Sequence, residues 1–186
     1  MRLARHAPPS GDVAVAAVAL VAAWALKAFY SRADADALQW ILAPTVQLAH
    51  WAGGVAFEWE PHLGYVSREQ RFLVAPACAS VNFLIAAFVS LCLGLAPACR
   101  GARARCGLVL GSAVAAYAVT LLANATRIAL AVRLHAAGAA FGPLSPERLH
   151  CALGVAVYFG FLLALFASAS RVPGTRRSRV ARRAPA

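Results

Sequence analysis

The chain has 186 residues, of which 61% are hydrophobic, and its mean hydropathy is +0.66. An average soluble domain contains only about 45–50% apolar residues, so this composition excludes an ordinary soluble fold and favours a membrane protein. The formal net charge is +11, but no stripe of basic and aromatic residues accompanies it, which argues against nucleic-acid binding. Cysteine occurs five times, and an odd number argues against a disulfide framework.

The first half of the chain predicts one membrane span, an interfacial helix and a small hairpin. Residues 13–30 form an apolar run of about the ~20 residues that a bilayer requires, and without a convincing cleavage site we interpret it as a retained span. Residues 37–51 are apolar but interrupted by polar residues and Pro44. They predict a helix lying along the interface, with a further crossing as the alternative. Residues 55–75 alternate apolar and polar side chains around a turn, which predicts a β-hairpin outside the hydrocarbon.

The second half of the chain predicts three more spans. They cover residues 77–96, 108–134 and 149–170. One membrane-embedded domain is therefore expected over residues 1–170, followed by a basic tail at 171–186. The fold class that we predict is an all-α integral membrane bundle of four transmembrane helices, or five if segment 37–51 also crosses. The hairpin and the interfacial helix would lie together on one side of the membrane.

The distribution of arginine predicts the orientation of these spans. Basic residues favour the cytoplasmic side of a membrane, and here they gather at the N-terminus, in the loop 97–107 and in the C-terminal tail. Four spans place all three segments in the cytoplasm, whereas five would put the basic N-terminus outside. We therefore expect a multi-pass protein of the cytoplasmic (inner) membrane, with residues 31–76 and the loop 135–148 on the extracytoplasmic side.

Three chemically reactive residues fall near the outer ends of their predicted spans. Cys78 and His150 begin their spans, and Arg127 lies about two turns from the outer end of its own. Residues three or four apart share a helix face, which adds Asn82 to Cys78 and Asn124 to Arg127. Polar groups inside a membrane are costly and usually face the protein interior. The sequence therefore predicts one polar pocket on the extracytoplasmic side.

The residue types in this pocket suit nucleophilic catalysis. A thiolate is a strong nucleophile, histidine can move protons, and arginine stays charged and can stabilise an oxyanion. The ordinary structural interpretations are a cysteine packed as a small hydrophobic residue and an arginine whose side chain reaches the interface. We interpret Cys151 as a structural residue too, because it faces about 100° away from His150 on a helix.

The predicted hairpin carries weaker candidates. Glu58, Glu60 and His62 share one strand face by the two-residue period. A solvated face is the favoured interpretation there and a metal site the less favoured one, so we predict no metal and no other cofactor. Tyr65 is a further candidate for substrate binding, on slighter grounds.

The order of the motifs resembles the exosortase/archaeosortase family, and most closely its short exosortase K type. The motifs are Pro76-Ala77-Cys78-Ala79-Ser80-Val81-Asn82-Phe83, Asn124-Ala125-Thr126-Arg127-Ile128, and His150 with Gly154. The likeness covers roughly residues 37–166, although many members have a different sequence, with glycine and often arginine, just after the cysteine.

The resemblance implies a membrane cysteine transpeptidase or protease acting on exported proteins. Such enzymes are thought to cleave C-terminal sorting signals made of a Pro-Glu-Pro-like motif, a transmembrane helix and a basic tail. Carried over residue by residue, Cys78 would be the nucleophile, Arg127 the transition-state stabiliser and His150 the acid/base, with Asn82 and Asn124 in support. The implied partners are the exported substrates and membrane lipid. The alternatives are a non-catalytic membrane assembly or scaffold protein, and a protease that uses water as its acceptor.

Overall fold

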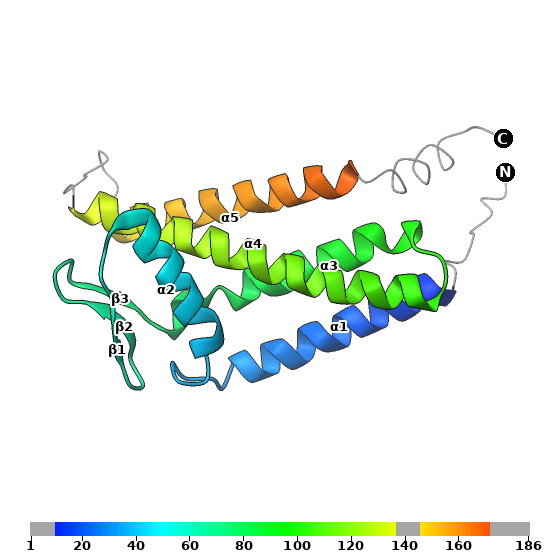
Figure 1. The fold of residues 1–186 in the computed structure, drawn as a ribbon, viewed down its shortest axis with the longest axis horizontal. Helices are drawn as coiled ribbons and strands as arrows, with labels where there is room; N and C mark the ends of the chain where they lie inside the picture. Colours follow the sequence, from blue (N-terminus) through cyan, green and yellow to red (C-terminus); the bar gives the residue numbers. More distant parts are fainter. Residues whose placement is uncertain (1–9, 137–145, 172–186) are drawn as a thin grey trace.

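Among the residues that the structure describes, four helices are long and apolar enough to cross a membrane. The computed structural model describes residues 10–136 and 146–171 of the chain. These candidate spans are α1 (Ser10–Tyr30), the stretch Pro76–Ala98 that contains α3 (Val81–Leu95), α4 (Ala102–Ala136) and residues Cys151–Ser170 of α5 (Pro146–Ser170). They run along the long axis of the molecule, and α3 contacts α1, α4 and α5 (Figure 1). The predicted helical bundle is therefore confirmed, as are four helices with the length and apolarity of membrane spans.

The surfaces of these helices fit a lipid environment better than water. Large apolar side chains point outward along the bundle; for example, Trp24 and Leu110 are 73% and 69% exposed. The contacts between helices include small residues, among them the fully buried Ala87 and Ala116, beside larger ones such as Leu91. Small residues let helix backbones approach closely, which is how helices associate where lipid is as apolar as the side chains.

Helix α2 (Gln39–Gly53) and a small sheet occupy one end of the bundle, which we call the sheet end (Figure 1). With 15 residues, α2 is about 22 Å long at ~1.5 Å per residue, shorter than a ~30 Å hydrocarbon core. It packs against α4, where the Tyr117 hydroxyl donates to the Trp40 carbonyl at 2.6 Å. The segment predicted at 37–51 is thus a short helix packed on the bundle.

The sheet has three antiparallel strands, in the order β1 (Glu58–Glu60), β2 (Gly64–Ser67) and β3 (Phe72–Val74). The prediction of a two-strand hairpin over 55–75 was therefore incomplete. Its return strand is divided by a second turn, in which Arg71 adopts a left-handed φ of 50° and its backbone N–H bonds to the Arg68 carbonyl at 3.4 Å.

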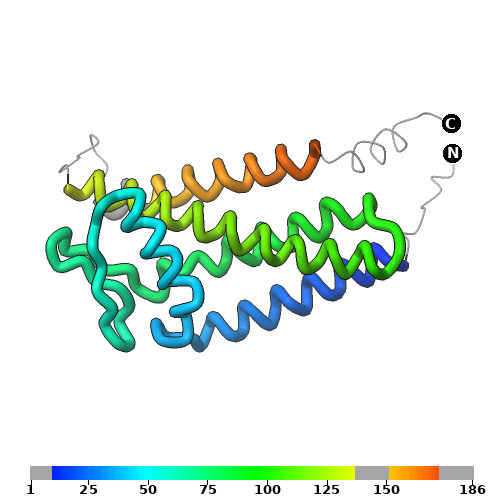
Figure 2. The backbone as a smooth tube through the Cα atoms, in the orientation of Figure 1, coloured from blue at the N-terminus to red at the C-terminus, as the bar shows by residue number. Residues whose placement is uncertain are grey.

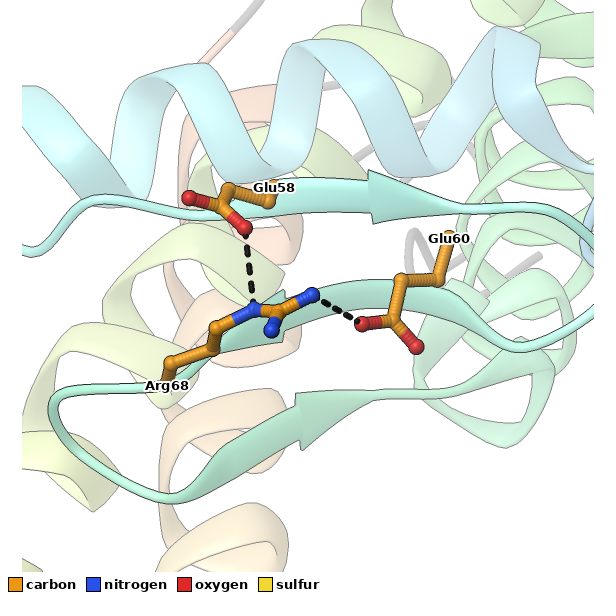
Figure 3. A network of polar contacts seen from close by, with 3 residues as sticks. All are labelled: Glu58, Glu60 and Arg68. Carbon is orange, nitrogen blue, oxygen red and sulfur yellow. Dashed lines mark hydrogen bonds and ion pairs between the residues drawn. The ribbon is translucent and has the colours of Figure 1, made fainter.

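Arg68 follows β2 and pairs with both acidic residues of β1. Its Nε lies 3.1 Å from Glu58 Oε2, and its Nη2 lies 3.1 Å from Glu60 Oε1 (Figure 3). Glu58 and Glu60 therefore do share one face of β1, as the two-residue period predicts, and an arginine binds there.

The chain alternates between the two ends of the bundle (Figure 2). α1 ends at the sheet end, α3 starts there, and α4 returns to it before α5 leaves again. At the opposite end, Arg105 of α4 reaches Asp12 of α1, with 3.5 Å between Nη2 and Oδ1. The start of α3, the last turns of α4 and the first turns of α5 therefore meet at the sheet end.

Gly64 is expected to be indispensable for the sheet. Its φ is +119°, and an added Cβ would lie 2.3 Å from the carbonyl oxygen of Val74, a backbone atom that cannot move aside cheaply. We expect Gly64→Ala to lower the thermal stability of the purified protein and to speed proteolysis within 55–75. Gly54→Ala is the matched control, because Gly54 also has a positive φ (+71°) but no atom within 4 Å of an added Cβ. Gly54→Ala should lower the free energy of unfolding only by about 1 kcal/mol, the amount expected of an alanine with left-handed dihedral angles. Equal behaviour of the two variants would contradict this account.

Candidate functional site

Cys78 lies in a 3₁₀ turn, Pro76–Ala79, and not in the following helix. The next residue, Ser80, has left-handed dihedral angles (φ 57°, ψ 26°), and α3 begins only at Val81. The sequence predicted one helix over 77–96 that would put Cys78 and Asn82 on the same face. That spacing rule does not apply, because the Ser80 backbone breaks the helix between them. The turn leaves Cys78 half-buried at the sheet end.

Asn124 of α4 connects directly to this turn. Its side chain is fully buried, and its Nδ2 donates a hydrogen bond to the carbonyl oxygen of Cys78. Its Oδ1 accepts a hydrogen bond of 3.1 Å from the hydroxyl of Tyr158 in α5. A buried amide needs partners for both of its polar ends, and Asn124 obtains them from two other elements. The structure therefore places Asn124 against the turn that carries the cysteine.

Arg127 lies one turn further along α4 and reaches the same cluster. Its Nη1 donates to the Tyr158 hydroxyl at 3.1 Å, and its guanidinium carbon lies 5.7 Å from the centre of the Tyr158 ring. Arg127 and Cys78 also interact through their side chains. The glycine at position 154 makes room for this arginine, since an added Cβ there would lie 3.4 Å from Arg127 Nε. The structure thus brings Cys78 and Arg127 together, as the topology predicted.

Tyr158 is the central residue that the sequence analysis missed. Its hydroxyl contacts Ser80, Asn124 and Arg127, and its ring stacks on Phe83 with 5.1 Å between the ring centres. The available signal was its spacing, because Tyr158 lies four residues after Gly154 and eight after His150, on the same face of an otherwise apolar helix.

Helix α1 adds a second cation near the cluster. Lys27 Nζ donates to Asn82 Oδ1 at 2.8 Å and lies 5.4 Å from the centre of the Tyr30 ring. Tyr30 in turn is close enough to Cys78 and Tyr158 to interact with them electrostatically. Asn82 therefore joins α1 to the start of α3, a contact that its spacing from Cys78 did not predict.

The two remaining predicted residues are His150 and Tyr65. His150 lies in α5, one turn before Gly154, but its side chain is outside the part of the chain that the structure describes. Tyr65 is half-buried in β2, where its ring packs edge-on against Trp59 with 4.9 Å between centres. Burial raises the pKa of the Tyr65 hydroxyl above its ordinary value, so this residue stays neutral at physiological pH.

One group of metal-ligand side chains occurs among the described residues, at the sheet end. It consists of Asp34, Asp36 and His62, whose ligand atoms lie within 4.8 Å of one another and are exposed. His62 Nδ1 lies 2.7 Å from Asp36 Oδ2 and 4.0 Å from Asp34 Oδ2. The imidazole of His62 is therefore beside these aspartates and not with Glu58 and Glu60, which Arg68 binds. Arg68 therefore occupies the carboxylates of β1, and His62 contacts the two aspartates instead.

The cluster can supply a nucleophile, a fixed positive charge and several neutral hydrogen-bond donors within a bundle of apolar helices. Comparison of the chain with models of protein families, with curated protein sequences and with solved structures found no match.

Proposed function

We propose that this chain is a membrane-embedded cysteine transpeptidase or protease that cleaves C-terminal sorting signals of exported proteins. The observation that carries the proposal is the hydrogen-bonded group formed by Cys78, Asn124, Arg127 and Tyr158. These residues come from three different segments of an apolar bundle. Polar groups in such a setting are expensive to bury and typically mark a functional site. The motif order that resembles the exosortase/archaeosortase family supplies the type of reaction.

The orientation follows from the distribution of charge. The arginine-rich segment that joins α3 to the first turn of α4, with Arg100, Arg103 and Arg105, lies at the end of the bundle opposite the sheet, and basic segments next to membrane spans favour the cytoplasm. The sheet end, with the thiol, then faces the extracytoplasmic side of the cytoplasmic membrane. An exported protein held by its C-terminal helix would present its cleavage site at this level.

The reaction that we assign has two steps. The Cys78 sulfur attacks the carbonyl carbon of the scissile bond while its proton passes to His150, the predicted acid/base. Arg127 stabilises the negative charge on the carbonyl oxygen of the tetrahedral intermediate. Collapse of that intermediate breaks the C–N bond, the leaving amine takes the proton from His150, and a thioester to Cys78 remains. An acceptor amine, hydroxyl or water then attacks the thioester, which releases the product and restores the thiol.

A reporter cleavage assay tests this function. Exported reporters would end in a panel of Pro-Glu-Pro-like motifs, each followed by an apolar helix and a basic tail, and would be expressed with or without the chain. We expect cleavage of at least one reporter only when the chain is present, and mass spectrometry of the new C-terminus would identify the acceptor. Uncleaved reporters beside a folded, membrane-inserted chain would favour the scaffold alternative.

A further inference from the structure

Three hydrogen bonds of the cluster, which link Arg127, Tyr158, Asn124 and Cys78, all run in the same donor-to-acceptor direction. A guanidinium has donors only, so the 3.1 Å contact runs from Arg127 Nη1 to the Tyr158 oxygen. Tyr158 then donates its single proton to Asn124 Oδ1, and Asn124 Nδ2 donates to the carbonyl of Cys78. The partners also fix the orientation of the Asn124 amide, because a flipped amide would face a donor with its NH₂ and a carbonyl with its oxygen. The chain of bonds leads from Arg127 to the backbone of the nucleophile.

Tyr158 lies at the centre of this series of hydrogen bonds. Its proton is used by Asn124, and its oxygen accepts from Arg127 and contacts the Ser80 hydroxyl. Ser80 is the left-handed residue that ends the Cys78 turn. Stacking on Phe83 holds the ring independently of the hydroxyl. The Tyr158 oxygen therefore joins the arginine of α4 directly to Ser80 and, through Asn124, to the carbonyl of Cys78.

We propose that Tyr158 is the positioning residue that holds the guanidinium of Arg127 beside the Cys78 thiol. Hydrogen bonds in a low-dielectric interior are strong and reinforce one another along a chain. Without the Tyr158 hydroxyl, the arginine keeps its charge but loses the hydrogen bond that ties it, through Tyr158, to Ser80 and Asn124. The consequence for turnover rests on the proposed function, but the position of the charge beside the thiol does not.

The first experiment measures this position without any substrate. The full chain, purified with Cys78 as its only cysteine, is alkylated with anionic iodoacetate and with neutral iodoacetamide, and the ratio of the two rates is taken. A cation beside the thiol attracts the anionic reagent, so Arg127→Gln should lower the ratio about threefold or more. We expect Tyr158→Phe to lower it to nearly the Arg127→Gln value. Tyr158→Met, which also lacks the hydroxyl, provides a second test should the phenylalanine variant fold poorly.

Tyr117→Phe is the matched control for this experiment. Tyr117 also donates its hydroxyl proton to another element, at 2.6 Å from the Trp40 carbonyl, and also stacks on an aromatic ring. It should keep the wild-type ratio. A Tyr158→Phe ratio equal to that of Tyr117→Phe would overturn the proposal.

The second experiment follows reporter cleavage. For Tyr158→Phe we expect kcat to fall about tenfold to a hundredfold, the loss typical of removing a partner from a buried charged donor, while KM stays within about threefold. Equal loss in Tyr117→Phe would reveal a general packing effect and would contradict a positioning role. If no reporter is cleaved by the wild type, the proposed function fails, and the alkylation ratio still decides the role of Tyr158.

Discussion

Replacement of Cys78 by alanine or serine is expected to abolish reporter cleavage, with a loss of at least about a thousandfold, as for other enzymes that lose their nucleophile. The substitution should leave the backbone hydrogen bonds of the Cys78 turn unchanged. The hydrogen bond from Asn124 goes to the backbone carbonyl of Cys78, and the Cys78 backbone N–H bonds to the Ala75 carbonyl at 2.8 Å. Both bonds survive when only the thiol is changed, so the turn and the bundle should remain folded.

Cys106 and Cys151 provide the controls for the cysteine experiment. Both are exposed free thiols on other helices, and their replacement by serine should leave reporter cleavage unchanged. Membrane insertion and thermal unfolding of the Cys78 variants would be compared with those of the wild type. Continued processing at the wild-type rate by both Cys78→Ala and Cys78→Ser would refute a cysteine mechanism.

Replacement of Arg127 by lysine is expected to reduce cleavage about a hundredfold, the order of loss seen when one donor to an oxyanion is removed. Lysine keeps the positive charge but lacks the planar guanidinium. That plane is what lets Arg127 donate to the Tyr158 hydroxyl and lie over its ring. A single ammonium group cannot keep these contacts and also serve a developing oxyanion beside Cys78.

Arg133 is the matched control for Arg127. It lies in the same helix, six residues later, and its Nη2 donates to the Ala52 carbonyl at 2.7 Å, a bond that ties α4 to α2. A lysine amine can donate to a carbonyl, so Arg133→Lys should retain cleavage. Wild-type cleavage by Arg127→Lys would mean that Arg127 contributes only its charge. Equal losses in the two variants would mean that Arg127 contributes only to the stability of the protein.

The sequence by itself predicted four helices that are long and apolar enough to span a membrane, and it placed Cys78 and Arg127 toward the same end of the bundle. Hydropathy over about 20 residues is a local property, so the four long apolar helices could be predicted without knowledge of their neighbours. Alternation of the spans then placed Cys78 and the outer part of α4 at the same end. The three-residue spacing of Asn124 and Arg127 put both on one helix face, and both contact Tyr158.

Only the tertiary structure decided how these residues are connected. Whether Asn82 turns to Cys78 or to Lys27 depends on the break at Ser80 and on how α1 packs against α3. The role of Tyr158 was hidden for the same reason. A tyrosine in an apolar span is unremarkable until the packing of α5 brings its hydroxyl to Arg127. Periodicity gives the face of a helix, but the partner of that face is set by side-chain packing between segments that are distant in the sequence.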